Sequence, residues 1–385
     1  MSSAASSDAR VRARRAATIA EAASRDVDRD ARFPSEALDA LRKERLLSIA
    51  VPRALGGEDA SLSELAAVCE VLAGSCASTA MIFAMHQIQI LCLVRHAADD
   101  EALRSYLAAC CERQLLIASA TSEIGVGGDI RTSKCALEAD GDEVRLEKQA
   151  SVVSYGAHCD AILATARRTP EAAPSDQVAV LLTREQTELT RLSDWDTLGM
   201  RGTCSCGFTV RARAPRGYVL PHAFERVAAE TMHPVSHLLW AHVWLGIATA
   251  AVSIARRFVR AEARKKPGTT PPSALRAAEL VSQLDVLRGS VRDALATYEA
   301  LRDDPEGLSA MRFQIRMNGL KVATAEQVPP LVLAAMGICG IASYRNDTEY
   351  TLGQKLRDAL GAGVMIANDR LYGNNAVLLL VSKED

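Results

Sequence analysis

The sequence predicts an α+β fold in which a central antiparallel β-domain separates two helical regions. Apolar residues recur at helical spacing from about residue 8 to 115 and again after residue 225. Between these regions, short alternating runs such as residues 143–147 are separated by Gly, Pro and Asp turns, which is typical of antiparallel strands. We therefore expect an N-terminal helical domain at 1–117, a middle β-domain at 118–224 and a C-terminal helical bundle at 225–385.

Cap residues and breaks divide the N-terminal region into separate helices. One helix is expected to begin at Ser35, and the Val51-Pro52 and Gly56-Gly57 pairs interrupt the pattern. Ser61 and Glu64 fit a capping box that restarts it. A nearly all-apolar stretch follows at 79–94, which predicts a fully buried helix.

The C-terminal region predicts five helical segments after the β-domain. Their expected bounds are about 233–265, 273–303, 307–335, 348–358 and 363–380. The Pro- and Gly-rich residues 265–272 predict the loop between the first two of them.

Composition and charge narrow the class of protein. The 385 residues carry a formal net charge of −2 without a basic stripe, so we expect no nucleic-acid partner. The ten cysteines include Cys110-Cys111 and a Cys204/Cys206 pair, neither of which has zinc-ligand spacing, so no metal is expected. The apolar run 243–255 is too short to span a bilayer. These features predict a cytoplasmic protein with reduced, buried cysteines and no membrane span.

A glycine-dense turn at residues 121–129 opens the predicted β-domain. It contains Gly125, Gly127 and Gly128, and backbone without Cβ atoms allows amide groups to approach a ligand closely. Successive N–H groups in such a turn can hold an anion such as a pyrophosphate. An ordinary β-turn explains the same residues, because glycine supplies positive φ without strain.

Several short phrases, in order, resemble the acyl-CoA dehydrogenase family. Residues 122–129 resemble its T-E-P-G-A-G-S-D turn, residues 198–203 match its L-G-M-R-G-T connector, and residues 356–359 match its L-R-D-A phrase. Phe33-Pro34-Ser35 followed by Val51-Pro52 is similar to its N-terminal domain. The likeness covers nearly the whole chain.

This resemblance implies a bound FAD between the β-domain and the C-terminal helices, in a homo-oligomer that is a dimer or tetramer. Ser122 corresponds to a Thr near the flavin ring, and Ser154 to a hydroxyl at flavin N5. The backbone of Gly127 and Gly128 would face the pyrophosphate. Arg264 corresponds to an Arg that reaches the cofactor of a neighbouring subunit, where a guanidinium suits a phosphate.

The chain departs from the family at its catalytic base. Ile366 and Ser236 stand at the two places where the family has a Glu that abstracts the α-proton, and neither side chain can take this proton. Asp369 and His86 are the candidate replacements. An ion pair between Asp369 and Arg370, and a core role for His86, are the structural alternatives.

Three functions are compatible with these features. The first is an FAD-dependent oxidoreductase of a specialised pathway that oxidises the Cα–Cβ bond of an acyl thioester. It would act on an acyl-CoA or acyl-carrier-protein substrate and pass electrons to a partner flavoprotein or to oxygen. The second is a flavin-dependent monooxygenase on the same scaffold, although its relatives usually carry histidines after L-R-D-A and this chain has none between Asp358 and Asp385. The third is a binding subunit without a redox role.

Overall fold

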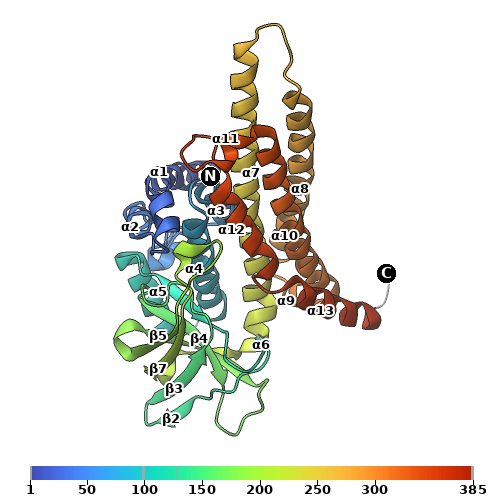
Figure 1. The fold of residues 1–385 in the computed structure, drawn as a ribbon. Helices are drawn as coiled ribbons and strands as arrows, with labels where there is room; N and C mark the ends of the chain where they lie inside the picture. The colour runs from blue at the N-terminus through green and yellow to red at the C-terminus, as the bar shows by residue number, and fades with distance from the viewer. Residues whose placement is uncertain (1, 98–99, 128, 383–385) are drawn as a thin grey trace.

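The computed structural model describes residues 2–97, 100–127 and 129–382, and it confirms the α+β fold (Figure 1). The N-terminal helices and the β-domain lie together along one side of a long C-terminal helical bundle. The order along the chain is helices, then strands, then helices, as the sequence predicts.

The N-terminal region is helical throughout. Its helices are α1 (Ser2–Arg29), α2 (Ser35–Lys43), α3 (Leu62–Ser75), α4 (Ala77–His96) and α5 (Glu101–Arg113). The predicted capping box begins α3: the Ser61 hydroxyl accepts from the backbone N–H of Glu64, and the Glu64 carboxylate accepts from the N–H of Ser61 at 2.8 Å. The apolar stretch predicted as a buried helix forms most of α4, whose described residues are almost all buried.

The middle region contains two four-stranded sheets. The first has the order β1 (Ile117–Ala120), β4 (Ala161–Arg167), β5 (Gln177–Thr183) and β8 (Val219–Ala223). The second has the order β2 (Glu138–Asp140), β3 (Glu143–Ala150), β7 (Gly207–Pro215) and β6 (Thr187–Ser193). Every strand pair in the described residues is antiparallel except β1–β4, where the chain returns to the first sheet in parallel after forming β2 and β3.

The C-terminal region begins with α6 (Phe224–Val227) and a π-helical turn, Ala228–Met232. The remaining helices are α7 (His233–Lys265), α8 (Ser273–Leu301), α9 (Pro305–Ser309), α10 (Met311–Cys339), α11 (Ile341–Tyr344), α12 (Gly353–Val364) and α13 (Asn368–Val381). The predicted loop joins α7 to α8, and this helical hairpin extends beyond the rest of the molecule (Figure 1).

Helix α7 lies at the centre of the molecule and joins its regions. It packs against α3 and α4 from the N-terminal region and against α8, α10 and α12 from the C-terminal region. Its Trp244 is fully buried. The first half of α7, which follows the β-domain directly, is therefore fixed on several sides and can hold a site rigidly.

Three helical segments are long and apolar enough to cross a membrane by length and composition: Ala77–His96, Phe224–Lys265 and Met311–Cys339. The most apolar 18-residue stretch of each segment is 83%, 83% and 50% buried inside the protein, in that order. This finding differs from the sequence prediction of no span, because the sequence argument used a run of 13 residues, 243–255, and the helix that contains it is much longer.

Candidate functional site

The glycine turn is joined to the segment that carries Ser154. The Ser122 hydroxyl donates to the carbonyl of Val152 at 2.8 Å and accepts from the N–H of the same residue at 3.1 Å. Its proton is therefore used inside the protein, and Ser122 fixes the turn beside the strand rather than offering a donor to a ligand. Gly127 has a φ of 60°, and a Cβ there would meet no atom within 4 Å, so its backbone faces open space. Gly128 lies outside the described residues.

A buried carboxylate beneath the turn holds it in place. Glu123 accepts from the Ser133 hydroxyl at 2.7 Å and from the backbone N–H of Cys135 at 2.8 Å, and the Lys148 ammonium lies at 3.4 Å. Burial alone would raise the pKa of Glu123, but these donors and the lysine charge keep it below the usual value. The turn is therefore anchored from below by an ionised group.

Ser154 ends a chain of three buried hydroxyl groups. Its Oγ lies 2.8 Å from the Oγ of Ser205, which lies 2.8 Å from the hydroxyl of Thr203. The Thr203 hydroxyl reaches the carbonyl of Met200 at 2.8 Å. The Ser205 hydroxyl donates to Ser154 Oγ and the Thr203 hydroxyl donates to the Met200 carbonyl, so the proton of Ser154 is not used within this chain. Ser154 can therefore donate its own proton to a ligand.

The surface around these polar groups is apolar. Ile124 is 47% exposed and lies two residues after Ser122 in sequence. Val152 is 40% exposed and is hydrogen-bonded through its backbone to the Ser122 hydroxyl. Exposed apolar side chains, a hydroxyl donor and a glycine turn without Cβ atoms fit the three parts of a flavin: its ring, its N5 atom and its phosphate. The residues present therefore fit this cofactor.

The beginning of α13 closes over the glycine turn. The Arg370 guanidinium donates to the carbonyl of Gly127. Asp369 precedes it in the first helical turn and is exposed. The structure thus brings Gly127 close to the segment that contains Asp369, although the two are some 240 positions apart in sequence.

A buried lysine holds the residue that stands where the family has its base. Lys321, on α10, is fully buried and donates to the carbonyl of Ile366 at 2.6 Å and to the Asn368 side chain at 2.7 Å. Its ammonium also lies 5.8 Å from the centroid of the Trp244 ring, within cation–π range. Burial lowers the pKa of Lys321 to about 8. Ile366 itself has a left-handed backbone, with a φ of 52°.

Sequence reasoning missed Lys321, although one signal marked it. Lys321 falls on the same helical face as Met317 and Thr324, both of which are buried. A lysine on an apolar helical face needs a partner, and such positions are candidate functional residues.

His86 has a packing role in this geometry. One ring nitrogen lies 2.7 Å from the carbonyl of Leu47, and the other accepts from the N–H of Ile117 at 3.0 Å. Burial lowers the pKa of His86 to about 4, so the ring is neutral. Both nitrogens are occupied and neither can take a substrate proton, which argues against the catalytic role considered for His86. Ile117 in turn accepts from the Tyr155 hydroxyl at 3.0 Å, so His86 supports the strand behind Ser154.

The remaining predicted positions lie on α7. Ser236 donates its hydroxyl proton to the carbonyl of Met232. Arg264 is exposed near the far end of α7, at the tip of the projecting hairpin (Figure 1). The two residues are about 40 Å apart at 1.5 Å per helical residue. Arg264 is therefore remote from the glycine turn of its own chain.

No group of three or more His, Cys, Asp or Glu residues in the described part of the chain could hold a metal ion. All ten cysteines are free thiols, and nine of them are buried.

Comparisons with known proteins agree with this architecture. Residues 7–114 match the family model described as "Acyl-CoA dehydrogenase, N-terminal domain". The amino sugar nitrososynthase DnmZ of Streptomyces peucetius is 29% identical over 356 residues, which are 90% of this chain and 85% of that protein. The match therefore extends over nearly the full length of both proteins.

Two solved structures share the fold. KijD3 in complex with FMN and dTDP-3-amino-2,3,6-trideoxy-4-keto-3-methyl-D-glucose aligns with a TM-score of 0.86 at 23% identity, over 100% of this chain and 96% of that chain. FMN-bound TdsC from Paenibacillus sp. A11-2 aligns with a TM-score of 0.85 at 19% identity, over 98% of both chains. Residues 7–114 thus match the acyl-CoA dehydrogenase N-terminal domain, and the whole chain shares the fold of KijD3 and TdsC.

Proposed function

We propose that the protein is a flavin-dependent monooxygenase that uses reduced flavin and molecular oxygen. The observation that carries this proposal is the contact between Lys321 and Ile366. Dehydrogenation of an acyl thioester needs a base that takes the α-proton, and general-base catalysis contributes about 10²–10⁴ in rate. At the position where the family has this base, the chain has Ile366, whose side chain is apolar. The backbone carbonyl of Ile366 accepts a hydrogen bond from the Lys321 ammonium. A monooxygenase needs no such base at this position.

The relatives support the same reaction class. TdsC is described as a dibenzothiophene monooxygenase and DnmZ as an amino sugar nitrososynthase. We therefore propose a substrate with an electron-rich sulfur or nitrogen atom, from a specialised pathway. TdsC and KijD3 were solved with FMN, so we propose FMN as the cofactor; FAD stays the alternative.

Each part of the site has a role in this proposal. A bound reduced flavin would supply two electrons, so that one atom of O₂ enters the substrate and the other leaves as water. The Ser154 hydroxyl would donate to the flavin ring, and the Ser205 hydroxyl, which donates to Ser154 Oγ, would hold it in this orientation. The backbone of Gly127 and the guanidinium of Arg370 would lie beside the flavin phosphate.

The test is oxygen incorporation. The purified chain is supplied with chemically reduced FMN or FAD under ¹⁸O₂, together with amino sugar nucleotides, sulfur heterocycles and acyl thioesters. We expect a product that contains one ¹⁸O atom per turnover, from a nitrogen or sulfur substrate. Anaerobic bleaching of bound flavin by an acyl thioester, with no labelled product, would instead show a dehydrogenase.

Asp369 keeps the dehydrogenase as a second candidate. It is exposed in the first turn of α13, next to the Arg370 that contacts the glycine turn. In this case Asp369 would be a relocated base acting on an acyl-CoA or an acyl-carrier-protein thioester, with a flavoprotein or oxygen as electron acceptor. Replacing Asp369 by Asn would then lower turnover with an acyl thioester by about 10²-fold or more. Full activity of this variant would exclude the role.

We also propose that the chain forms a homo-oligomer. The end of α13 exposes a run of apolar side chains, among which Leu380 is 86% exposed. A second copy that covers this surface would remove a large apolar area from water. It would also allow Arg264 of one chain to approach the cofactor of another. Light scattering on the wild type and on Leu380→Asp tests this proposal: we expect a dimer or tetramer that the substitution weakens. A cytoplasmic location stays a prediction.

A further inference from the structure

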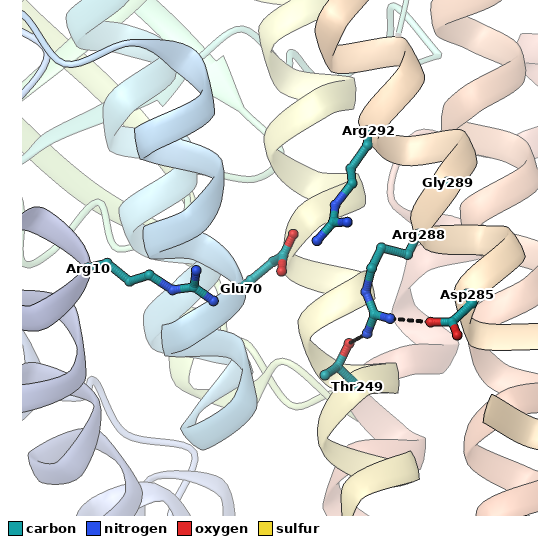
Figure 2. A pocket seen from close by; sticks show the side chains of 7 residues that line it. All are labelled: Arg10, Glu70, Thr249, Asp285, Arg288, Gly289 and Arg292. Atoms are coloured by element: carbon teal, nitrogen blue, oxygen red, sulfur yellow. Dashed lines mark hydrogen bonds and ion pairs between the residues drawn. The ribbon is translucent and has the colours of Figure 1, made fainter. Parts of the chain in front are cut away.

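A charged cleft lies between the N-terminal and C-terminal helices, away from the proposed flavin site. It has a volume of about 490 Å³, and we call it the arginine cleft. Its lining residues come from α1, α3, α7 and α8: Arg10, Glu70, Thr249, Asp285, Arg288, Gly289 and Arg292. Figure 2 shows Arg10 and Arg292 extending from opposite sides towards the Glu70 carboxylate. Thr249 follows Ser236 by 13 residues on α7, which is about 20 Å along the helix.

The cleft has an excess of positive charge. Arg288 is bound within the protein, because it pairs with Asp285 and lies 3.5 Å from the Thr249 hydroxyl. Arg10 and Arg292 form no hydrogen bond or ion pair with another residue in the described part of the chain. Two guanidinium groups therefore face the cleft with their donors available.

The one carboxylate between them is held by a buried histidine. Glu70 Oε1 lies 2.6 Å from Nδ1 of His242, whose side chain is 3% exposed. Nε2 of His242 is buried without a hydrogen-bond partner. The position of Glu70 is thus fixed from the protein interior, and its charge offsets only part of the charge of the two free arginines.

The chemistry of the lining indicates the kind of ligand. None of the lining residues has an apolar side chain, and the charged groups that reach the cleft favour an anion over an acyl chain or an aromatic substrate. The volume admits a small molecule rather than a single water. Guanidinium groups donate in a planar fork that matches phosphate oxygens. We propose that the arginine cleft binds a phosphate-bearing anion, as a second ligand site separate from the flavin site.

Substitutions of the cleft's arginines and of its carboxylate should change the phosphate affinity in opposite directions. Removing a guanidinium should weaken phosphate binding, whereas removing the negative charge of Glu70 should strengthen it. Glu70→Gln retains an oxygen that accepts from His242, so the shape of the cleft is kept. Non-specific attraction to the protein surface would follow the same signs, so saturable binding at one site and an unchanged affinity in a variant that removes a nearby arginine outside the cleft distinguish the two cases.

The experiment is calorimetric titration of the full chain, saturated with the flavin that it binds, at constant ionic strength set by KCl. The probes are inorganic phosphate and adenosine 5′-monophosphate, which distinguish free phosphate from a phosphate ester. We expect one site per chain, about five- to tenfold weaker binding in Arg10→Gln and Arg292→Gln, and several-fold tighter binding in Glu70→Gln. Equal affinities for the two probes would assign the site to phosphate itself, and a preference for the ester would assign it to a larger ligand.

Arg276→Gln is the matched control, because Arg276 is exposed on the same helix as Arg292 and lies outside the cleft. Its affinity should equal that of the wild type. Thermal unfolding confirms that each variant is folded. No saturable binding of either probe, or the same affinity in Arg292→Gln and wild type, would overturn the proposal. Because this assay measures binding alone, its result is independent of the reaction that the flavin site performs.

Discussion

The backbone N–H of Met200 donates to the buried carboxylate of Asp358 at 2.7 Å. This bond joins the connector at 198–203 to the helix α12, which are more than 150 residues apart. Arg357 adds a second link, since it donates to the carbonyl of Leu198 at 2.8 Å and pairs with Asp28 of α1. Three regions of the chain therefore meet at one point, beside the hydroxyl chain that begins at the Met200 carbonyl.

Asp358 should make stability depend on pH. Burial raises the pKa of Asp358 to about 6 from 3.8, so the folded state holds this proton more tightly than the unfolded state. The stabilisation is complete below about pH 4 and is lost as pH rises to about 6. We expect the free energy of unfolding of wild type relative to Asp358→Asn to fall across this range, by up to about 3 kcal/mol. Urea unfolding of both proteins at several pH values measures it. A constant difference would contradict the prediction.

Gly199 allows the connector to approach α12. A Cβ at this position would lie 2.2 Å from the carbonyl oxygen of Arg357, which is backbone and cannot rotate away. We expect Gly199→Ala to lower the free energy of unfolding by about 2 kcal/mol or more. The control is Gly74→Ala in α3, where a Cβ would meet nothing within 4 Å and alanine favours the helix. Thermal denaturation of the two variants tests the contrast, and equal melting temperatures would count against it.

Lys321 should affect activity more than stability. Lys321→Met removes a charge that is costly to bury, so its melting temperature should stay close to that of wild type. The segment 366–368 would lose its anchor, and we expect turnover to fall about ten- to a hundredfold because the adjoining α13 shifts over the glycine turn.

A second lysine provides the control for this prediction. Lys355 lies on α12, and its ammonium donates to the carbonyl of Gly74 of α3 at 2.8 Å rather than to the segment 366–368. Lys355→Met should retain turnover. Steady-state kinetics and thermal unfolding of Lys321→Met and Lys355→Met test the prediction. Unchanged turnover in Lys321→Met would show that this lysine only supports the fold.

Ser154 should tune the bound flavin. Its hydroxyl can donate to the reduced ring and stabilise the negative charge that develops there. We expect Ser154→Ala to lower the two-electron midpoint potential by about 20–40 mV, which corresponds to the loss of one hydrogen bond. Spectroscopic redox titration measures the potential. Ser151→Ala, on the exposed part of the same segment, should leave it unchanged. A wild-type potential in both variants would remove Ser154 from the site.

Local patterns predicted most of the helices well. The expected helix at 233–265 agrees with α7, and the capping box at Ser61 and Glu64 forms as predicted. These features depend on neighbours within a few residues, which the sequence shows directly. The last two helices are displaced by several residues from the prediction. The chain turns there at Ile366, which adopts a left-handed backbone without the Gly or Pro that normally marks a break.

Long-range contacts account for what the sequence did not reveal. The parallel pairing of β1 with β4 brings together strands separated by about 40 residues, and no local pattern specifies such a partner. Lys321 likewise shows its role only through Ile366, which lies 45 residues later. The sequence left both a catalytic role and a core packing role open for His86. Only its contacts with Leu47 and Ile117 in the folded structure distinguish the two.

The left-handed backbone of Ile366 makes this position one where a substitution can raise the stability of the fold. A branched residue in this conformation costs about 1–3 kcal/mol, which glycine would not incur. Replacing Ile366 by Gly could therefore raise the melting temperature, and the added stability would offset the cost of new side chains introduced nearby. This position would then become the natural entry point for directed evolution of this scaffold.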